Sequence, residues 1–228
     1  MKRLFLIIIM VISMMFNLTS CADSIEGEKI KIGVIDTSIS KDTINKYGIK
    51  NSTDFVYEEI DDNFTHGAIV LNIIDENAKN YDIYYASALD STQTGEIEDV
   101  VSSIDWCIQN NVDIICMSFA TLSTDNTLQE RISVAKEAGI IVVASCINYS
   151  DLTCYPAMCD GVISVSEGAN PNATIIIEEK FFEIKIDNEV VEWNGCSALT
   201  AYVCGRIADE LSNGKEDVFE IIENIKEN

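Results

Sequence analysis

Short runs of apolar residues, rich in valine and isoleucine, recur along the chain between stretches of turn-forming and charged residues. Runs of this length are typical of strands buried on both faces of a parallel sheet. They predict strands near residues 30–36, 81–87, 112–118, 140–145 and 162–165. Between them, apolar residues at helical spacing predict helices near residues 66–75, 96–110 and 126–138. The alternation indicates an α/β fold whose mainly parallel sheet is covered by helices on both faces.

The C-terminal part of the chain has a different pattern. Residues 174–193 read as a hairpin, with strand-like stretches at 174–177 and 181–186 and turn residues at 187–188. Two further helices are expected near residues 197–211 and 216–225. The hydrophobic content of 47% excludes a disordered chain, and no repeat or Pro/Gly-rich linker divides it. One domain is therefore expected over residues 30–228.

The N-terminus has the pattern of an export signal. Two basic residues precede an apolar run over residues 4–16, which is shorter than a membrane-spanning helix needs. The run is followed by Leu-Thr-Ser-Cys ending at Cys21, which resembles the bacterial lipobox. That resemblance implies that residues 1–20 are a signal peptide, that Cys21 is lipidated, and that residues 21–29 are a tether. The alternative is an ordinary signal peptide in which Cys21 occurs by coincidence.

The chain has one histidine, His66, and two candidate partners for it in sequence. A neutral imidazole is the usual general base near neutral pH. Asp36 ends the first predicted strand, and Ser197 lies between a glycine turn and a helical stretch, where backbone N–H groups can receive an oxyanion. A lone histidine is more often structural than catalytic. The order Asp, His, Ser along the chain favours nucleophilic catalysis instead.

Three motifs in this order resemble those of the subtilisin-like serine proteases: Val34-Ile35-Asp36-Thr37-Ser38, His66-Gly67-Ala68-Ile69-Val70 and Gly195-Cys196-Ser197. The segments between them that are also similar to the family are 111–119, 139–148, 155–157 and 162–165. The resemblance covers roughly residues 30–211. It implies a subtilisin-like three-layer sandwich and a serine peptidase with an Asp-His-Ser triad.

The resemblance also implies a role for each matched residue. Ser197 Oγ would attack the scissile carbonyl while His66 takes its proton, and Asp36 would hold the imidazole tautomer. The side-chain amide of Asn148 would bind the oxyanion together with the Ser197 N–H, although Asn148 also reads as a turn residue. The edge that binds the substrate would consist of Ser118, Phe119 and Ala120.

Four residues near these positions depart from the family pattern. Ile147 and Ala120 stand where the family usually has glycine, Cys196 replaces a threonine, and Ala201 replaces a proline. A β-branched residue such as Ile147 restricts the backbone. These departures support an alternative function, a catalytically impaired lipoprotein that binds peptides or a partner protein. A Cys196 thiol nucleophile is a further alternative, although Ser197 holds the family position.

The formal net charge of −23 disfavours nucleic acid as a partner and favours cationic partners. An acidic segment at residues 58–62 shortly precedes His66 and would steer a basic peptide toward the site. The alternative for this segment is an ordinary solvated face. The expected partners are a peptide or protein substrate, basic peptides included, and the membrane through a lipid anchor. The chain is expected to act as a monomer.

The cysteines and acidic residues do not predict a metal site. Cys154 and Cys159 bracket a short loop that a disulfide could close in an oxidising exterior. Other cysteines in apolar surroundings are expected to be buried hydrophobic residues: Cys107, Cys116 and Cys204. Cys-Xaa-Xaa-Cys is absent, and no acidic loop has the ligand spacing of a calcium site. No metal or other cofactor is therefore expected.

Taken together, the sequence predicts a serine endopeptidase anchored outside a bacterial cell. Only about ten residues separate Cys21 from the first predicted strand, so no folding prodomain is expected between them. A small, tethered enzyme of this kind suits limited processing of an exported peptide or protein.

Overall fold

A parallel sheet with the strand order β2-β3-β1-β4-β5-β6-β7 forms the centre of the computed structural model, which describes residues 28–168, 170–187 and 189–227. All neighbouring strands in this order run parallel. The strands are β1 (Ile30–Thr37), β2 (Asn51–Asp54), β3 (Tyr81–Leu89), β4 (Ile114–Met117), β5 (Ile141–Ser145), β6 (Ile163–Glu167) and β7 (Ile175–Ile177). The α/β fold class and the mainly parallel sheet predicted from the sequence are confirmed.

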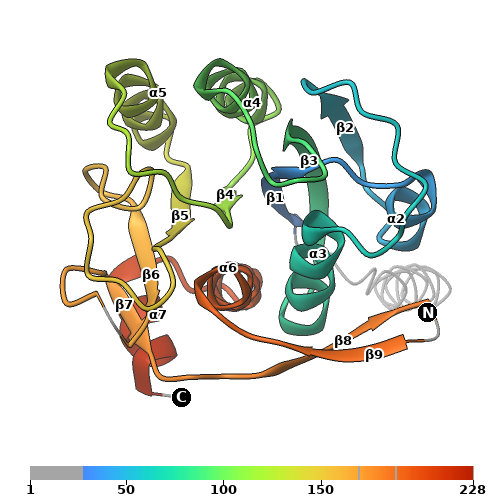
Figure 1. Cartoon of the computed structure of the whole chain (residues 1–228). Helices are drawn as coiled ribbons and strands as arrows, with labels where there is room; N and C mark the ends of the chain where they lie inside the picture. Colours follow the sequence, from blue (N-terminus) through green and yellow to red (C-terminus); the bar gives the residue numbers. More distant parts are fainter. Residues whose placement is uncertain (1–27, 169, 188, 228) are drawn as a thin grey trace, which may run out of the picture.

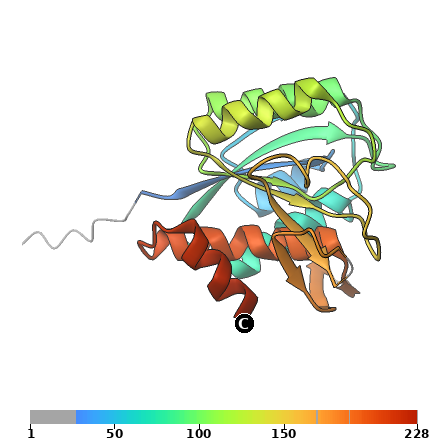
Figure 2. The same cartoon turned by 90° about the vertical axis from the view of Figure 1, so that its left-hand side faces the viewer.

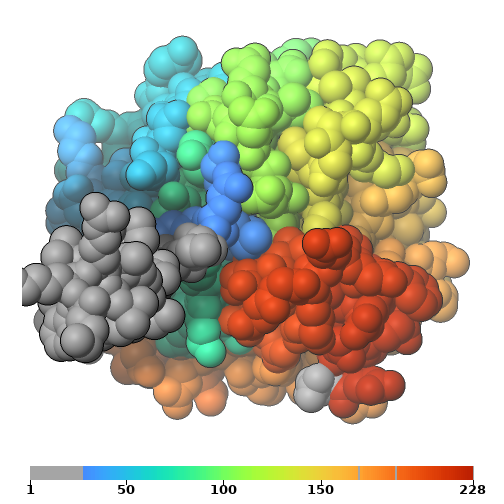
Figure 3. Space-filling model, turned by 180° about the vertical axis from the view of Figure 1, so that it is seen from behind, coloured from blue at the N-terminus to red at the C-terminus, as the bar shows by residue number. Residues whose placement is uncertain are grey.

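Helices cover both faces of this sheet (Figure 1). Helices α4 (Ile97–Gln109) and α5 (Asn126–Glu137) pack on one face. On the other face lie α3 (His66–Asn77), α6 (Cys196–Ser212) and α7 (Val218–Glu227). The three layers are separated clearly when the molecule is turned by 90° (Figure 2). Seen from behind, the C-terminal helices, in red, cover the lower right part of the visible surface (Figure 3).

Helices α3 and α6 approach each other closely, and a glycine makes this possible. A Cβ added at Gly205 of α6 would lie 2.9 Å from the Cβ of Asn77 and 3.1 Å from the carbonyl oxygen of Ile74, both in α3. Contacts this short leave no room for a side chain. Gly205 therefore allows the helix that begins at His66 and the helix that carries Ser197 to pack this closely.

The expected hairpin over residues 174–193 is correct in its second half and wrong in its first. Residues 175–177 form β7, which pairs in parallel with β6 and extends the main sheet. The Ile175 side chain is buried in the core on the face of the sheet that α7 covers, which favours this pairing. The hairpin consists instead of β8 (Phe182–Ile186) and β9 (Glu189–Trp193), paired antiparallel. The alternating burial of β8 shows that one of its faces covers the core.

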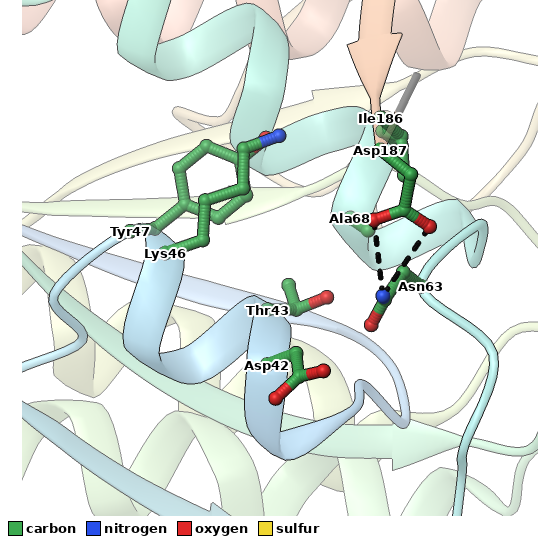
Figure 4. Close-up of a pocket in the computed structure, with 8 residues that line it drawn as sticks. All are labelled: Asp42, Thr43, Lys46, Tyr47, Asn63, Ala68, Ile186 and Asp187. Atoms are coloured by element: carbon green, nitrogen blue, oxygen red, sulfur yellow. Dashed lines mark hydrogen bonds between the residues drawn. The ribbon is translucent and has the colours of Figure 1, made fainter. Parts of the chain in front are cut away.

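Polar contacts fasten this hairpin to α2 (Lys41–Lys46) and to the loop before α3 (Figure 4). Asn63 donates through Nδ2 to the two carboxylate oxygens of Asp187, at 3.2 and 3.3 Å. Lys46 Nζ donates to the carbonyl oxygen of Lys185 at 2.9 Å. Lys46, Asn63 and Asp187 border a cavity of about 140 Å³, with Tyr47 and Ala68 on its walls. The hairpin is thus held against the N-terminal half of the molecule.

The predicted signal peptide, the lipidated Cys21 and most of the tether lie outside the described residues. Within the described part of the chain, no helix has the length and apolar composition needed to cross a bilayer. The cysteines there are free thiols, so the Cys154–Cys159 disulfide that the sequence allowed is not formed. As expected, Cys107, Cys116 and Cys204 are buried.

Candidate active site

The candidate site lies at the carboxyl ends of the parallel strands, where open α/β sheets generally bind their ligands. Asp36 is the penultimate residue of β1, Ser118 directly follows β4, and Asn148 follows β5 by three residues. Ser197 is brought to the same edge by α6, since its Oγ donates to the carbonyl oxygen of Ser118 at 2.7 Å. Residues separated by many positions in the sequence are therefore neighbours here.

His66 is the first residue of α3, and the structure around it depends on the glycine that follows. The Thr65 side chain caps the helix by accepting from the Ala68 N–H. A Cβ at Gly67 would lie 1.8 Å from the Tyr85 hydroxyl, which itself donates to the carbonyl oxygen of Thr37 at 2.6 Å. Only glycine leaves room for this packing, which holds the start of α3 against the end of β1.

Asp36 and His66 form a direct pair. Their Oδ1 and Nδ1 atoms are 2.7 Å apart, and Oδ1 also accepts from the Thr37 N–H at 2.7 Å. The Asp36 side chain is fully buried and that of His66 is 7% exposed. Burial lowers the pKa of His66, but the charge and hydrogen bond of Asp36 outweigh burial and leave the pKa raised above its usual value. The carboxylate thus orients the ring and stabilises its protonated form.

Ser197 lies in the first turn of α6, after a sharp turn at Gly195, whose φ is 99°. Glycine adopts this conformation without strain. The Asn148 Oδ1 atom accepts from the Cys196 N–H at 2.6 Å, so the oxyanion candidate is bonded to the residue before the nucleophile candidate. Asn148, His66 and Ser197 border the same cavity. In this structure the Ser197 hydroxyl donates to Ser118 rather than to the imidazole.

This cavity has a volume of about 220 Å³, and all the predicted catalytic, oxyanion-hole and substrate-binding residues except Asp36 line it. Apart from the imidazole of His66, the cavity is lined by no basic or acidic side chain of the Asp, Glu, Lys or Arg type. The lining residues are His66, Leu89, Gln93, Ser118, Phe119, Ala120, Ser145, Cys146, Ile147, Asn148 and Ser197. The arrangement gives a general base, a hydroxyl and hydrogen-bond donors around one solvent-open pocket. It is suited to the attack of the hydroxyl on a carbonyl carbon.

Leu89 and Gln93 also line the cavity, and the sequence did not predict them as site residues. Gln93 has a φ of 64° and sits in a tight turn in which the Asp90 carboxylate accepts from Thr92 and Thr94. The turn-forming composition Asp-Ser-Thr-Gln-Thr-Gly directly after an apolar strand was the available signal.

The alternative of a Cys196 nucleophile does not fit the structure. Cys196 is fully buried, and its Sγ accepts from the Glu167 N–H at 3.3 Å. Burial raises the pKa of this thiol, which disfavours the reactive thiolate.

In the described part of the chain, no group of three or more His, Cys, Asp or Glu residues is arranged to hold a metal ion.

Comparison with known proteins decides the family. The sequence profile of the subtilase family, Peptidase S8, matches residues 27–176. The chain belongs to the subtilase family. The matched region contains Asp36, His66 and Asn148 and ends before Ser197.

Individual subtilases show the same relationship over different lengths. The chain is 33% identical to the minor extracellular protease Epr of Bacillus subtilis over 61% of its own length and 23% of that protein. It is 31% identical to subtilisin DY of Bacillus licheniformis over 63% of this chain and 58% of the relative. It is 24% identical to a subtilisin of Bacillus pumilus over 82% of this chain and 78% of the relative. The chain thus spans less than two thirds of the length of the first two relatives.

Proposed function

We propose that this subtilase is a serine endopeptidase that hydrolyses peptide bonds with Asp36, His66 and Ser197. The observation that carries the proposal is the 2.7 Å pair between Asp36 Oδ1 and His66 Nδ1, with Ser197 in the cavity that the imidazole borders. The matched relatives named as proteases and subtilisins support the same reaction class.

The proposed reaction begins with the Ser197 hydroxyl turning from the Ser118 carbonyl toward the imidazole. The Asp36 bond occupies Nδ1, which leaves Nε2 to take the proton as Oγ attacks the carbonyl carbon. The Asn148 amide and the Ser197 N–H then stabilise the oxyanion. The imidazolium gives its proton to the leaving amine. In the second half of the reaction, His66 takes a proton from water as the water attacks the acyl-enzyme. The imidazolium then returns a proton to Ser197 Oγ as the acyl group leaves.

The lining of the cavity suggests what the enzyme cleaves. Apolar side chains form much of the wall, namely Leu89, Phe119, Ala120, Cys146 and Ile147. We therefore propose an uncharged, mainly apolar side chain next to the scissile bond. Any preference for basic peptides would arise outside this cavity, at the acidic segment 58–62.

A fluorophosphonate probe tests the proposal, because it reacts covalently with an activated serine. We expect the wild type to be labelled and Ser197→Ala to be unlabelled, with Ser102→Ala as a matched control that keeps wild-type labelling. Ser102 lies on α4, where its hydroxyl donates to the Glu98 carbonyl. Incubating the same proteins with a peptide library and sequencing the products gives the cleavage preference. A folded wild type that neither reacts nor cleaves would contradict the proposal.

That last outcome would favour a second candidate, a subtilase-like protein that binds peptides without cleaving them. The observation that favours it is the bond from Ser197 Oγ to the Ser118 carbonyl, whereas a serine poised for attack would donate to the imidazole. Ile147 and Ala120 on the cavity wall, and Cys196 before the nucleophile, depart from the family pattern in the same region. A binder would retain peptide affinity in Ser197→Ala and show no turnover in either form.

We further propose that the protein is held outside the cell membrane by lipid on Cys21, with residues 1–20 removed as a signal peptide. The support is the sequence that ends at Cys21 and the apolar run before it. Stable attachment needs more than one acyl chain. Changing Cys21→Ser is expected to move the protein from the membrane fraction to the medium, while Cys107→Ser leaves it at the membrane. Retention of the Cys21→Ser protein in membranes would contradict the anchor.

A further inference from the structure

Glu167 is a buried acidic residue for which the proposed mechanism has no role. It ends β6 at the same edge of the sheet as the candidate active site, and the residue is 5% exposed. Both of its carboxylate oxygens are buried and lack a hydrogen-bond partner within the described part of the chain. An ionised carboxylate in such surroundings is unfavourable, so burial favours the neutral carboxyl.

Hydrogen bonds connect the backbone of Glu167 to the proposed oxyanion hole. Its backbone N–H donates to Cys196 Sγ at 3.3 Å, and the Cys196 N–H donates to Asn148 Oδ1 at 2.6 Å. Two contacts therefore link Glu167 to Asn148, and one peptide bond separates Cys196 from Ser197. Glu167 is therefore connected through Cys196 to both groups proposed to bind the oxyanion.

The titratable groups that face Glu167 come from three elements. Glu179 follows β7, Tyr149 follows β5, and Cys196 begins α6. Burial raises the pKa of Glu167, and the negative charge of Glu179 raises it further. In return, the Glu167 charge is the main cause that raises the pKa of Tyr149, the residue next to Asn148. The Glu167 carboxylate is thus electrostatically coupled to Tyr149, which follows Asn148 in the chain.

We propose that Glu167 is a positioning residue of the oxyanion hole, which supports turnover while its carboxyl is neutral and slows turnover once it is ionised. The proposal rests on the proposed peptidase function. The tetrahedral intermediate places a negative charge between Asn148 and Ser197, and a second negative charge behind the same turn opposes it. Asp36 is the charged group that raises the pKa of His66, and Glu167 is not among the causes of that shift. An effect of the Glu167 charge on turnover is therefore expected at the oxyanion.

The test is the pH dependence of kcat for peptide hydrolysis by the wild type and by Glu167→Gln. Because glutamine stays neutral, the ratio of kcat for Glu167→Gln to that for the wild type should rise with pH, from about one where Glu167 is neutral to on the order of tenfold where it is ionised. KM should change little. Glu178→Gln, an exposed neighbour of Glu179 in sequence, is the matched control and should give a ratio that does not vary with pH.

Glu179→Gln is a second variant that keeps the test decisive if Glu167→Gln does not fold. Removing the Glu179 charge lowers the pKa of Glu167, so the wild-type loss of kcat should begin at lower pH in this variant. A pH-independent ratio for a folded Glu167→Gln, or an unchanged profile for Glu179→Gln, overturns the role of Glu167. Enzyme that neither hydrolyses peptide nor reacts with a fluorophosphonate at any pH contradicts the proposed function and this inference together.

Discussion

Replacing His66 by alanine is expected to abolish peptide hydrolysis while the protein still folds. The chain contains no second histidine, so no other imidazole can accept the Ser197 proton. Loss of the base should lower kcat by at least about 10⁴-fold, the scale seen when members of the triad are removed from subtilisin itself. The measurement is single-turnover and steady-state hydrolysis, together with the unfolding transition of each protein.

Glu76→Ala is the matched control for His66→Ala. Glu76 is an exposed residue of the same helix, so its variant should keep both activity and stability. If His66→Ala hydrolysed peptide at the wild-type rate, the imidazole would have no part in the reaction. The triad mechanism would then be wrong, even if the probe labelled Ser197.

Replacing Asp36 by asparagine is expected to lower kcat by about 10⁴-fold, because the amide favours the wrong imidazole tautomer, as it does in trypsin-like proteases. It should also change the pH dependence. Burial lowers the pKa of His66 and Asp36 raises it, so without Asp36 only the lowering effect remains. The acid limb of the residual activity should therefore move to lower pH, which a kcat/KM profile measures.

The same substitution has a pH-dependent effect on stability. Because the pKa of His66 is raised in the folded protein, the ion pair stabilises fully below the pKa of the unfolded histidine, about 6.5, and this stability is lost as pH rises through the folded value. The loss of unfolding free energy in Asp36→Asn should thus be larger in acid than in alkali. Asp160→Asn, at an exposed side chain, should show no such dependence. Equal losses at both pH values would contradict the ion pair.

The sequence predicted the parts of the fold whose signals are local and strong. Buried strands such as Ile114–Met117 are continuous apolar runs, and the predicted helices near them have helical spacing. Short elements were missed, because α2 has six residues and β2, Asn51–Asp54, has no apolar residue. The place of β7 in the sheet depends on its pairing with β6, in which Ile175 lies opposite Val165. A local sequence pattern carries no information about such a pairing.

The sequence likewise identified some residues of the site and not others. The Asp36 and His66 motifs identify residues that the structure does bring into contact, and Asn148 and Ser197 share the cavity with His66. The sequence did not single out Glu167, since a glutamate just after a predicted strand is normally expected to be exposed. Its burial arises from neighbours distant in sequence, among them Cys196. The same holds for the bond between Ser197 and Ser118, which are 79 positions apart.

The close crossing of α3 and α6 at Gly205 concerns the geometry of the catalytic groups, and other parts of the molecule shape the cavity walls. His66 and Ser197 each lie in the first turn of one of these helices, so a helix pair fixed at Gly205 sets the reach from base to nucleophile. The cavity walls at Leu89, Gln93 and Ile147 come from loops and strand ends outside this pair. Substrate preference can therefore diverge among such enzymes by loop changes while the chemical step keeps its geometry.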